Sequence, residues 1–391
     1  MSLPPFSYLP PASGPLALYV HWPFCVSKCP YCDFNSHVRA DIDHDAWRRA
    51  LLEDLAHEAR LNDGRELSSI FFGGGTPSLM PPDIVAALID AATGYWSPTS
   101  DIEITLEANP SSVEAARFSD LASAGVNRVS LGLQALEDEA LHFLGRAHDV
   151  REGLGALEIA QSVFGRVNFD LIYARPGQSE SDWEAELAQG LSFGTDHLSL
   201  YQLTIEPGTR FATLVAQGKL MPADPDHGAT LYELTQAMTT AAGLPAYEIS
   251  NHARVGQQSR HNLTYWRYGD YAGIGPGAHG RRQGLATLRH RKPENWMSAV
   301  QRNGHGLHSE EPLAATDQAR EALLMGLRLA EGIDLSHVAT LSGLPAADLV
   351  DEEAIARLVV LGLLERDGPW LRVTQAGMLL LDAILPEVVL A

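Results

Sequence analysis

All three cysteines of the 391-residue chain lie within one short segment, as Cys25, Cys29 and Cys32 in a C-x3-C-x2-C spacing. An odd and clustered set of cysteines is not a disulfide framework. Three thiolates on one tight loop can hold three corners of a 4Fe-4S cubane and leave its fourth iron without a protein ligand. The amine and carboxylate of S-adenosylmethionine (SAM) can chelate such an iron, and an electron accepted by the sulfonium would release a 5'-deoxyadenosyl radical.

Two other interpretations of the cysteines stay open at this point. One is a structural zinc site completed by His21 or His37, and the other is a set of unrelated buried thiols. The sequence holds no second cysteine pair to close a zinc ribbon, and aromatic residues flank the loop. These features favour the iron–sulfur cluster.

Alternating strands and helices are expected to position this loop. The β-rich runs lie at 17–21, 69–72, 102–106, 128–133, 168–173 and 197–203, and amphipathic helical runs lie at 45–61, 84–92 and 152–164. Strict alternation of strand and helix requires right-handed crossovers and a parallel sheet, which is either open or curled into a barrel. In such architectures the functional groups collect at the C-terminal ends of the strands.

Glycine-rich and polar residues stand at those strand ends. Residues 73–75 are a glycine triplet followed by Thr76, and a backbone without Cβ atoms can approach a ligand closely. Period-2 alternation puts Glu103, Thr105 and Glu107 on one face of the third strand. Glu107, at the end of that strand, could bond a ribose hydroxyl or the methionine amine. Each feature alone is equally typical of an ordinary turn or surface residue.

Together these features resemble the radical-SAM superfamily and, over nearly the full length, its oxygen-independent coproporphyrinogen III oxidase-like family. The resemblance implies an α/β fold with a partial (β/α)6 TIM-like barrel, in which the glycine triplet faces the SAM amino group, Arg146 pairs with the SAM carboxylate and Asp170 serves the ribose. The SAM-binding set that it implies is Tyr19, Tyr31, Gly74, Gly75, Thr76, Glu107, Gln134, Arg146 and Asp170. One departure concerns residues 174–178, which read Ala-Arg-Pro-Gly-Gln where the family usually has Gly-Leu-Pro-Gly-Gln. This departure puts the turn after Asp170 in doubt.

Two further features resemble the heme-chaperone branch of this family. Phe34 occupies the position where the family's oxidases carry a further cysteine, and residues 261–266 look like the H-N-x-x-Y-W motif of that branch. An imidazole can ligate heme iron while aromatic rings cover the porphyrin. The resemblance therefore implies heme contacts from His261, Asn262, Tyr265 and Trp266, with His279 as a second candidate ligand. The alternative is a capped turn whose aromatic residues seal the open side of the barrel and whose histidine is only hydrogen-bonded.

The function implied by the resemblance is that of a heme chaperone, which binds heme and delivers it to respiratory cytochromes. The 4Fe-4S cluster and SAM would be supporting cofactors, and no catalytic residue is assigned. Its partners would be heme-accepting respiratory proteins at the cytoplasmic membrane, and a homodimer stays open. The alternative function is an oxygen-independent coproporphyrinogen III oxidase, which oxidatively decarboxylates the propionates of its substrate.

Charge and hydropathy limit the other classes of function. A net charge of -21 argues against broad binding to nucleic acid, which depends on Lys and Arg displacing counterions from phosphates. No run approaches the roughly 20 apolar residues of a membrane span. Residues 1–15 carry no basic residue and resemble neither a signal peptide nor a transit peptide. We therefore expect a cytoplasmic protein whose contact with the membrane would be peripheral.

Three segments are expected along the chain: a barrel domain at 1–300, a polar linker at 301–312 and a small C-terminal domain at 313–391. Helical patterns at 317–331, 335–341 and 352–361 precede a hairpin at 363–373, which is typical of a winged-helix-like domain. From position 315 onward the chain holds many more acidic residues than arginines and no lysine. That balance argues against DNA as the partner and favours a lid or interaction role.

Overall fold

The computed structural model describes residues 14–39 and 41–390 of the chain. Its main feature is a sheet whose six central strands are parallel neighbours in chain order. These strands are β1 (Leu16–Trp22), β4 (Glu66–Gly74), β5 (Ser97–Ala108), β6 (Arg128–Gln134), β7 (Arg166–Tyr173) and β8 (His197–Gln202). The predicted α/β fold is confirmed. Residues 1–13, where we expected no leader segment, lie outside the described residues.

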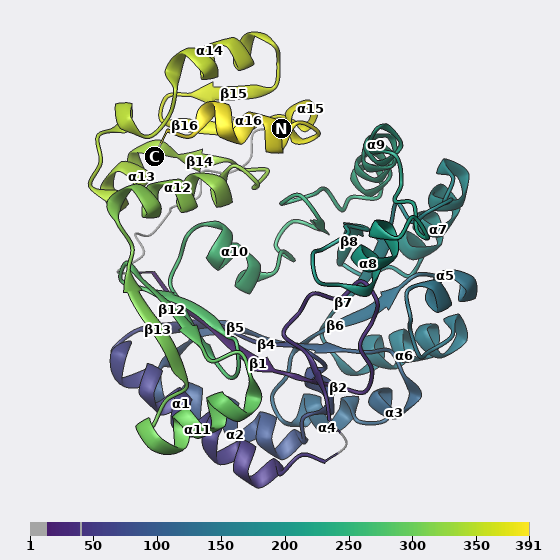
Figure 1. The fold of residues 1–391 in the computed structure, drawn as a ribbon, viewed down its shortest axis with the longest axis vertical. Coiled ribbons are helices and arrows are strands. Elements are labelled where there is room, and N and C mark those ends of the chain that lie inside the picture. Colours follow the sequence, from purple (N-terminus) through teal and green to yellow (C-terminus); the bar gives the residue numbers. More distant parts are fainter. Residues whose placement is uncertain (1–13, 40, 391) are drawn as a thin grey trace.

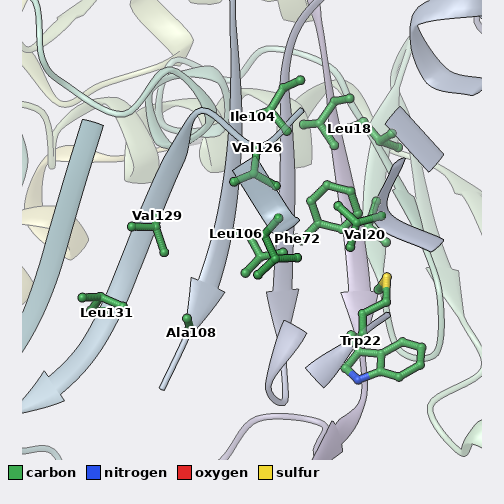
Figure 2. Packing of buried hydrophobic residues seen from close by; sticks show 14 of the residues in the cluster. Leu18, Val20, Trp22, Phe72, Ile104, Leu106, Ala108, Val126, Val129 and Leu131 are labelled. Carbon is green, nitrogen blue, oxygen red and sulfur yellow. The ribbon is translucent and has the colours of Figure 1, made fainter. Parts of the chain in front are cut away.

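Helices cover the outer face of this curved sheet (Figure 1). They include α1 (His44–Leu61), α2 (Pro82–Tyr95), α4 (Phe118–Ser123), α6 (Val150–Val163), α7 (Glu180–Ser192) and α9 (Pro225–Ala241). Helix α1 buries Trp47, Leu51 and Leu55, which recur every four residues on the face turned to the sheet. The strands contribute Val20, Phe72 and other apolar side chains to the same core (Figure 2). This core fixes the strand ends in space.

The segment predicted as a linker, 301–312, contains the end of a helix and an edge strand of the sheet instead. Helix α11 (Pro293–Asn303) runs into it, and β13 (Leu307–Pro312) pairs antiparallel with β12 (Leu285–Arg289). With β11 (His279–Arg282) and β10 (Tyr271–Ile274), these strands extend the sheet beyond β1. The polar sequence of 307–312 suits an exposed edge strand, where charged side chains discourage further pairing. The expected linker is therefore wrong.

Buried ion pairs hold this extension against α1. The side chains of Asp54, Glu58 and Arg289 are fully buried or nearly so, with Arg289 Nη2 at 2.6 Å from Glu58 Oε1. Asp54 also accepts hydrogen bonds from Trp296 Nε1 (3.1 Å) and from the backbone N–H of Gly306 (3.0 Å). Because every charge has a partner, these acidic residues can lie in the core.

The C-terminal domain has a hydrophobic core of its own, which includes Leu323, Val338, Ile355, Leu371 and Leu385. Its elements are α12 (Ala315–Gly326), β14 (Ile333–Asp334), α13 (Leu335–Ser342), α14 (Glu352–Val360), β15 (Leu364–Asp367), β16 (Trp370–Val373), α15 (Gln375–Met378) and α16 (Leu381–Val388). The expected helices and the β15–β16 hairpin are present, and β14 completes a three-stranded sheet.

Helix α10 (Arg260–Trp266) lies between the barrel and this domain (Figure 1). The residues just after it bind the C-terminal domain: the Arg267 guanidinium pairs with Glu331 at 2.6 Å, and the Tyr268 hydroxyl donates to Glu321 at 2.8 Å. Helix α10 thus links the barrel to the C-terminal domain. Among the described residues, none of the helices combines the length and apolar character needed to cross a membrane.

Candidate functional site

A cavity of about 1020 Å³ lies at the C-terminal ends of the central strands. The cysteine loop forms one wall, and the ends of β4 to β8 form another. The C-terminal domain closes the far side with Met378, Leu379 and Asp382. The fold thereby gathers groups from both domains around one space.

The cysteine loop is fixed by backbone hydrogen bonds to the end of β4. Gly75 N–H donates to Trp22 O at 2.7 Å, and Thr76 N–H donates to Phe24 O at 2.8 Å. A Cβ at position 75 would lie 2.7 Å from Phe24 O, so only glycine allows the two segments to approach this closely. The loop before the first cysteine therefore has one defined position.

The three thiols lie on this loop, partly buried and free of disulfides. Thr76 Oγ1 donates to Cys25 Sγ at 3.4 Å, and Arg146 Nη1 donates to Cys29 Sγ at 3.5 Å. Burial raises the pKa of the Cys25 and Cys32 thiols. A bound cluster would keep them as thiolates, and the two donors would then stabilise the sulfur charge.

The histidines of the zinc alternative are engaged elsewhere. The ring nitrogens of His21 both have partners, the Tyr19 hydroxyl at 2.9 Å and Asn35 O at 3.0 Å. His37 Nε2 lies 3.3 Å from Asn35 Oδ1. The described part of the chain contains no three His, Cys, Asp or Glu side chains grouped for a single metal ion. The donor set of the loop is three thiols, which suits a cubane with one open iron.

Two carboxyl groups, Glu107 on β5 and Asp170 on β7, line the cavity from either side of β6. Glu107 accepts a hydrogen bond from Gly74 N–H at 3.2 Å, and burial together with the nearby Asp170 raises the pKa of Glu107 to about 8. Burial raises the pKa of Asp170 to about 6, although Ser130 and Asn168 donate hydrogen bonds to it. A ligand amine or hydroxyl groups that donate hydrogen bonds to them would favour the ionised forms.

Arg146 has an unsatisfied donor at this site. Its Nη2 donates to Asn109 Oδ1 at 2.7 Å and to Gly132 O at 2.9 Å, whereas its Nε is buried and has no acceptor among the described residues. Gln134 ends β6 at a positive φ of 70°, and Gly132 leaves room for its side chain to fold back. A buried guanidinium with a free N–H fits a ligand carboxylate.

Comparison with known proteins agrees with this geometry. Residues 19–188 match the Radical SAM superfamily, and residues 313–380 match the HemN C-terminal domain. The chain is 41% identical to the bovine (Bos taurus) mitochondrial radical S-adenosyl methionine domain-containing protein 1 over 96% of this chain and 87% of the relative. It is 40% identical to heme chaperone HemW of Escherichia coli K12 over 95% of this chain and 97% of that protein. The chain belongs to this radical SAM family.

A solved structure supports the same conclusion about the fold. E. coli coproporphyrinogen III oxidase (HemN), a radical SAM enzyme, superposes with a TM-score of 0.80 at 25% identity, over 95% of this chain and 89% of that chain. The predicted family is confirmed. Membership implies a 4Fe-4S cluster and SAM. The three cysteine thiols fit the cluster, and the unpaired Nε–H of Arg146 and the carboxyl groups of Glu107 and Asp170 fit SAM.

The structure brings most of the predicted SAM residues together. Those that line the cavity are Tyr31, Gly74, Gly75, Thr76, Glu107, Gln134, Arg146 and Asp170. Tyr19 is absent from the lining, and its hydroxyl bonds to His21 instead. Tyr19 thus holds the His21 ring, whose other nitrogen bonds to Asn35 O after the cysteine loop.

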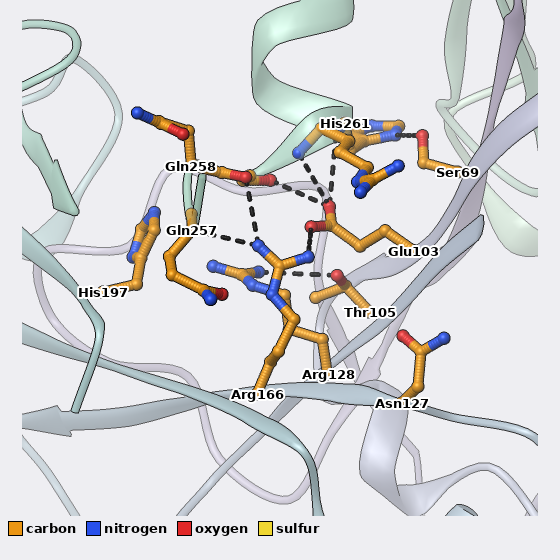
Figure 3. Close-up of polar contacts among 12 residues, drawn as sticks. Ser69, Glu103, Thr105, Asn127, Arg128, Arg166, His197, Gln257, Gln258 and His261 are labelled. Carbon is orange, nitrogen blue, oxygen red and sulfur yellow. Dashed lines mark hydrogen bonds and ion pairs between the residues drawn. The ribbon is translucent and has the colours of Figure 1, made fainter. Parts of the chain in front are cut away.

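The heme candidates lie outside this cavity. His261 is buried in α10 with Nδ1 at 3.3 Å from Ser69 Oγ, its ring stacked on Phe71 at 4.9 Å, and burial lowers its pKa to about 4 (Figure 3). Asn262 Nδ2 lies 3.5 Å from the Tyr247 hydroxyl. The Tyr265 and Trp266 rings pack together at 5.1 Å, and the exposed His279 bonds to the Tyr271 hydroxyl at 3.1 Å. None of the five lines the cavity. This geometry resembles the alternative interpretation, in which a capped turn seals the open side of the barrel and its histidine is only hydrogen-bonded.

The turn after Asp170 forms despite its unusual sequence. Ala174 adopts a φ of 55°, a conformation that favours the glycine usual in the family. Arg175 pairs with Glu186 at 2.7 Å, and Gln178 Nε2 donates to the same carboxylate at 3.1 Å. This buried pair holds the turn in place.

Sequence reasoning missed the wall of the cavity that lies beyond the SAM residues. Tyr201 on β8, Tyr232 on α9 and Met378 in α15 line it. The alternation of Leu198 and Leu200 with Ser199 and Tyr201 along β8 was a signal for Tyr201, because the second pair faces inward beside Asp170. No sequence pattern marks the C-terminal residues, because they reach the site only through domain packing.

Proposed function

We propose that this protein is a heme chaperone, which binds SAM at a 4Fe-4S cluster and carries heme to respiratory cytochromes. The observation that supports it best is the similarity over almost the whole chain to proteins named heme chaperone HemW. Phe34 adds to it, because this side chain lines the cavity where the family's oxidases carry a further cysteine.

The proposed cofactor site uses side chains that the cavity already gathers. Cys25, Cys29 and Cys32 would hold the cluster, whose open iron would take the amine and carboxylate of SAM. Arg146 would donate its free Nε–H to that carboxylate, while Glu107 would accept from the amine and Asp170 from the ribose hydroxyls. The cluster, when bound, supplies an electron-transfer centre.

The cavity has room for a second, larger ligand beside SAM. Tyr201, Tyr232, Ile249 and Met378 give the remaining wall an apolar and aromatic character suited to a porphyrin face. His261 is still our candidate for the axial ligand, but its imidazole would have to leave Ser69 and Phe71 to reach heme. Delivery would involve a respiratory acceptor at the cytoplasmic membrane, and we propose no fixed oligomeric state.

Anaerobic heme titration of the reconstituted holoprotein tests this function. We expect stoichiometric heme binding with a defined Soret band and no conversion of coproporphyrinogen III when SAM and reductant are supplied. Turnover at enzymatic rates would instead support the oxidase alternative, the activity for which the structurally similar HemN is named.

A second titration tests the ligand. His261→Ala should weaken heme binding and shift the Soret band, whereas His290→Ala, at a partly exposed histidine outside the cavity, should not. An unchanged spectrum for His261→Ala would mean that another side chain is the axial ligand, with Tyr201, Tyr232 and Met378 of the cavity wall as the next candidates.

A further inference from the structure

A chain of hydrogen bonds crosses the barrel interior and ends on Asp170. The Tyr247 hydroxyl lies 3.0 Å from His197 Nε2, and His197 Nδ1 lies 2.7 Å from Asn168 Oδ1. Asn168 Nδ2 in turn lies 3.0 Å from Asp170 Oδ1. Tyr247, His197 and Asn168 are buried, and none of the three lines the cavity.

The direction of each hydrogen bond follows from its neighbours. Asn168 Nδ2 donates to Asp170 Oδ1, to Ser130 Oγ at 2.6 Å and to Ser199 Oγ at 3.0 Å. The two serine hydroxyls can accept from it because they donate their own protons to Asp170 and Asn251. Asn168 Oδ1 therefore accepts, which requires the proton of His197 to be on Nδ1. The Nε2 of a neutral imidazole is then an acceptor, so the Tyr247 hydroxyl donates to it.

His197 can both accept from Tyr247 and donate to Asn168 because its imidazole stays uncharged. Burial, helped by Arg128 and Arg166, holds the pKa of His197 well below its ordinary value (Figure 3). A neutral imidazole has one donor and one acceptor, and both are used here. The chain therefore has a single hydrogen-bonding polarity, from the Tyr247 phenol to the Asp170 carboxylate.

We propose that Tyr247, His197 and Asn168 are positioning residues that aim the Asp170 carboxylate at the ribose of SAM. The proposal rests on the role of Asp170 given under the proposed function. Asn168 and Ser130 both donate to Oδ1, so they fix the rotation of the carboxylate in the cavity. If the Asn168 amide turned over, its oxygen would face Asp170 and repel it. His197 prevents this turn because its donor holds Asn168 Oδ1.

The same tyrosine contacts the C-terminal domain. Ala330 N–H donates to Tyr247 O at 3.0 Å, and Glu248 forms a β-bridge with Leu329. Asn262 of α10 lies 3.5 Å from the Tyr247 hydroxyl. The packing of the C-terminal domain and of α10 therefore helps to set the position of the Tyr247 phenol, the first group in this series of hydrogen bonds.

Comparing two ligands of the reconstituted holoprotein tests the proposal. SAM contacts both the open iron and the ribose site, whereas free L-methionine carries only the amine and carboxylate. Tyr247→Phe should weaken SAM binding by about fivefold, the effect of one lost hydrogen bond, and leave methionine binding unchanged. Both dissociation constants are measured anaerobically from the change in the EPR signal of the reduced cluster. Tyr271→Phe, whose phenol bonds to His279 outside the cavity, is the control.

A double-mutant cycle separates positioning from general loosening of the barrel. In an Asp170→Asn background, Tyr247→Phe should have no further effect on SAM binding. The proposal would be overturned if Tyr247→Phe weakened SAM and methionine binding equally, or if it left the SAM dissociation constant unchanged. It would also be overturned if Tyr247→Phe weakened SAM binding as much in the Asp170→Asn background as in the unmodified protein. If Tyr247→Phe yields no folded holoprotein, Ser130→Ala removes the other donor to Oδ1 and should give the same selective loss.

The effect of Asp170→Asn alone on SAM binding shows whether a negative result concerns the positioning residues or the ribose role of Asp170. If it leaves SAM binding unchanged, the ribose role of Asp170 is wrong and the positioning proposal falls with it. The heme titration does not depend on this result, so it tests the chaperone function separately.

Discussion

Replacing Arg175 with leucine, the residue usual in the family, should destabilise this protein strongly. The Arg175 and Glu186 side chains are each 7% exposed, and Arg175 donates to Glu186 at 2.7 and 3.3 Å and to Ile172 O at 2.8 Å. Leucine would leave the Glu186 carboxylate buried with only Gln178 Nε2 and Leu136 N–H as donors. Breaking a buried pair from one side costs roughly 3–5 kcal/mol. Because two donors remain, we expect about 3 kcal/mol here.

Urea unfolding of the purified protein, followed by tryptophan fluorescence, measures this loss. Arg254→Leu is the matched control, because its pair with Asp196 is about half exposed and such pairs contribute roughly 0–1 kcal/mol. Arg175→Leu combined with Glu186→Leu should recover part of the stability, since both buried charges are removed. A loss for Arg175→Leu no larger than that of the control would refute the reasoning.

Three further predictions concern the cofactor site. Gly75→Ala should greatly reduce the iron content after reconstitution, because its Cβ would meet Phe24 O at 2.7 Å, whereas Gly94→Ala, with open space around it, should not. SAM binding should tighten as the pH rises from 6 toward 8, because the pKa of Glu107 is about 8 in the free site and its ionised form accepts a hydrogen bond from the iron-bound amine of SAM. A pH dependence of the dissociation constant that is as steep in Glu107→Gln as in the unmodified protein would contradict this. Arg146→Gln should weaken SAM and methionine alike by about 10- to 100-fold, as expected for a charged hydrogen bond to the carboxylate that both share, and a loss confined to SAM would place Arg146 elsewhere.

Local sequence was sufficient for the central strands and the cofactor loop. Each of the six strands contains a β-rich run with polar or glycine-rich residues at its end, and the glycine triplet marks the place where β4 meets the loop. Glu107 was identifiable because strand alternation aims it into the barrel beyond the core-facing residues, whereas Asp170 was identified through the family resemblance. In parallel α/β folds, such positions follow from short-range patterns.

Contacts between segments that lie far apart in the sequence could not be predicted from such local patterns. Arg282 and Arg289 are buried against acidic residues of α1 that lie more than 200 positions earlier. Such pairing leaves no periodic trace in either segment. The same reason explains His261, whose buried contacts with Ser69 and Phe71 depend on where α10 packs.

The cavity wall supplied by Met378, Leu379 and Asp382 has a consequence for exchange of a large, flat ligand. Because those residues belong to a domain with its own core, a rigid-body displacement of that domain would widen the entrance without unfolding anything. Its contacts through Tyr247 and Arg267 would hold the domain during such a displacement, and the exposed Val26 and Phe34 line the cysteine wall of the same cavity.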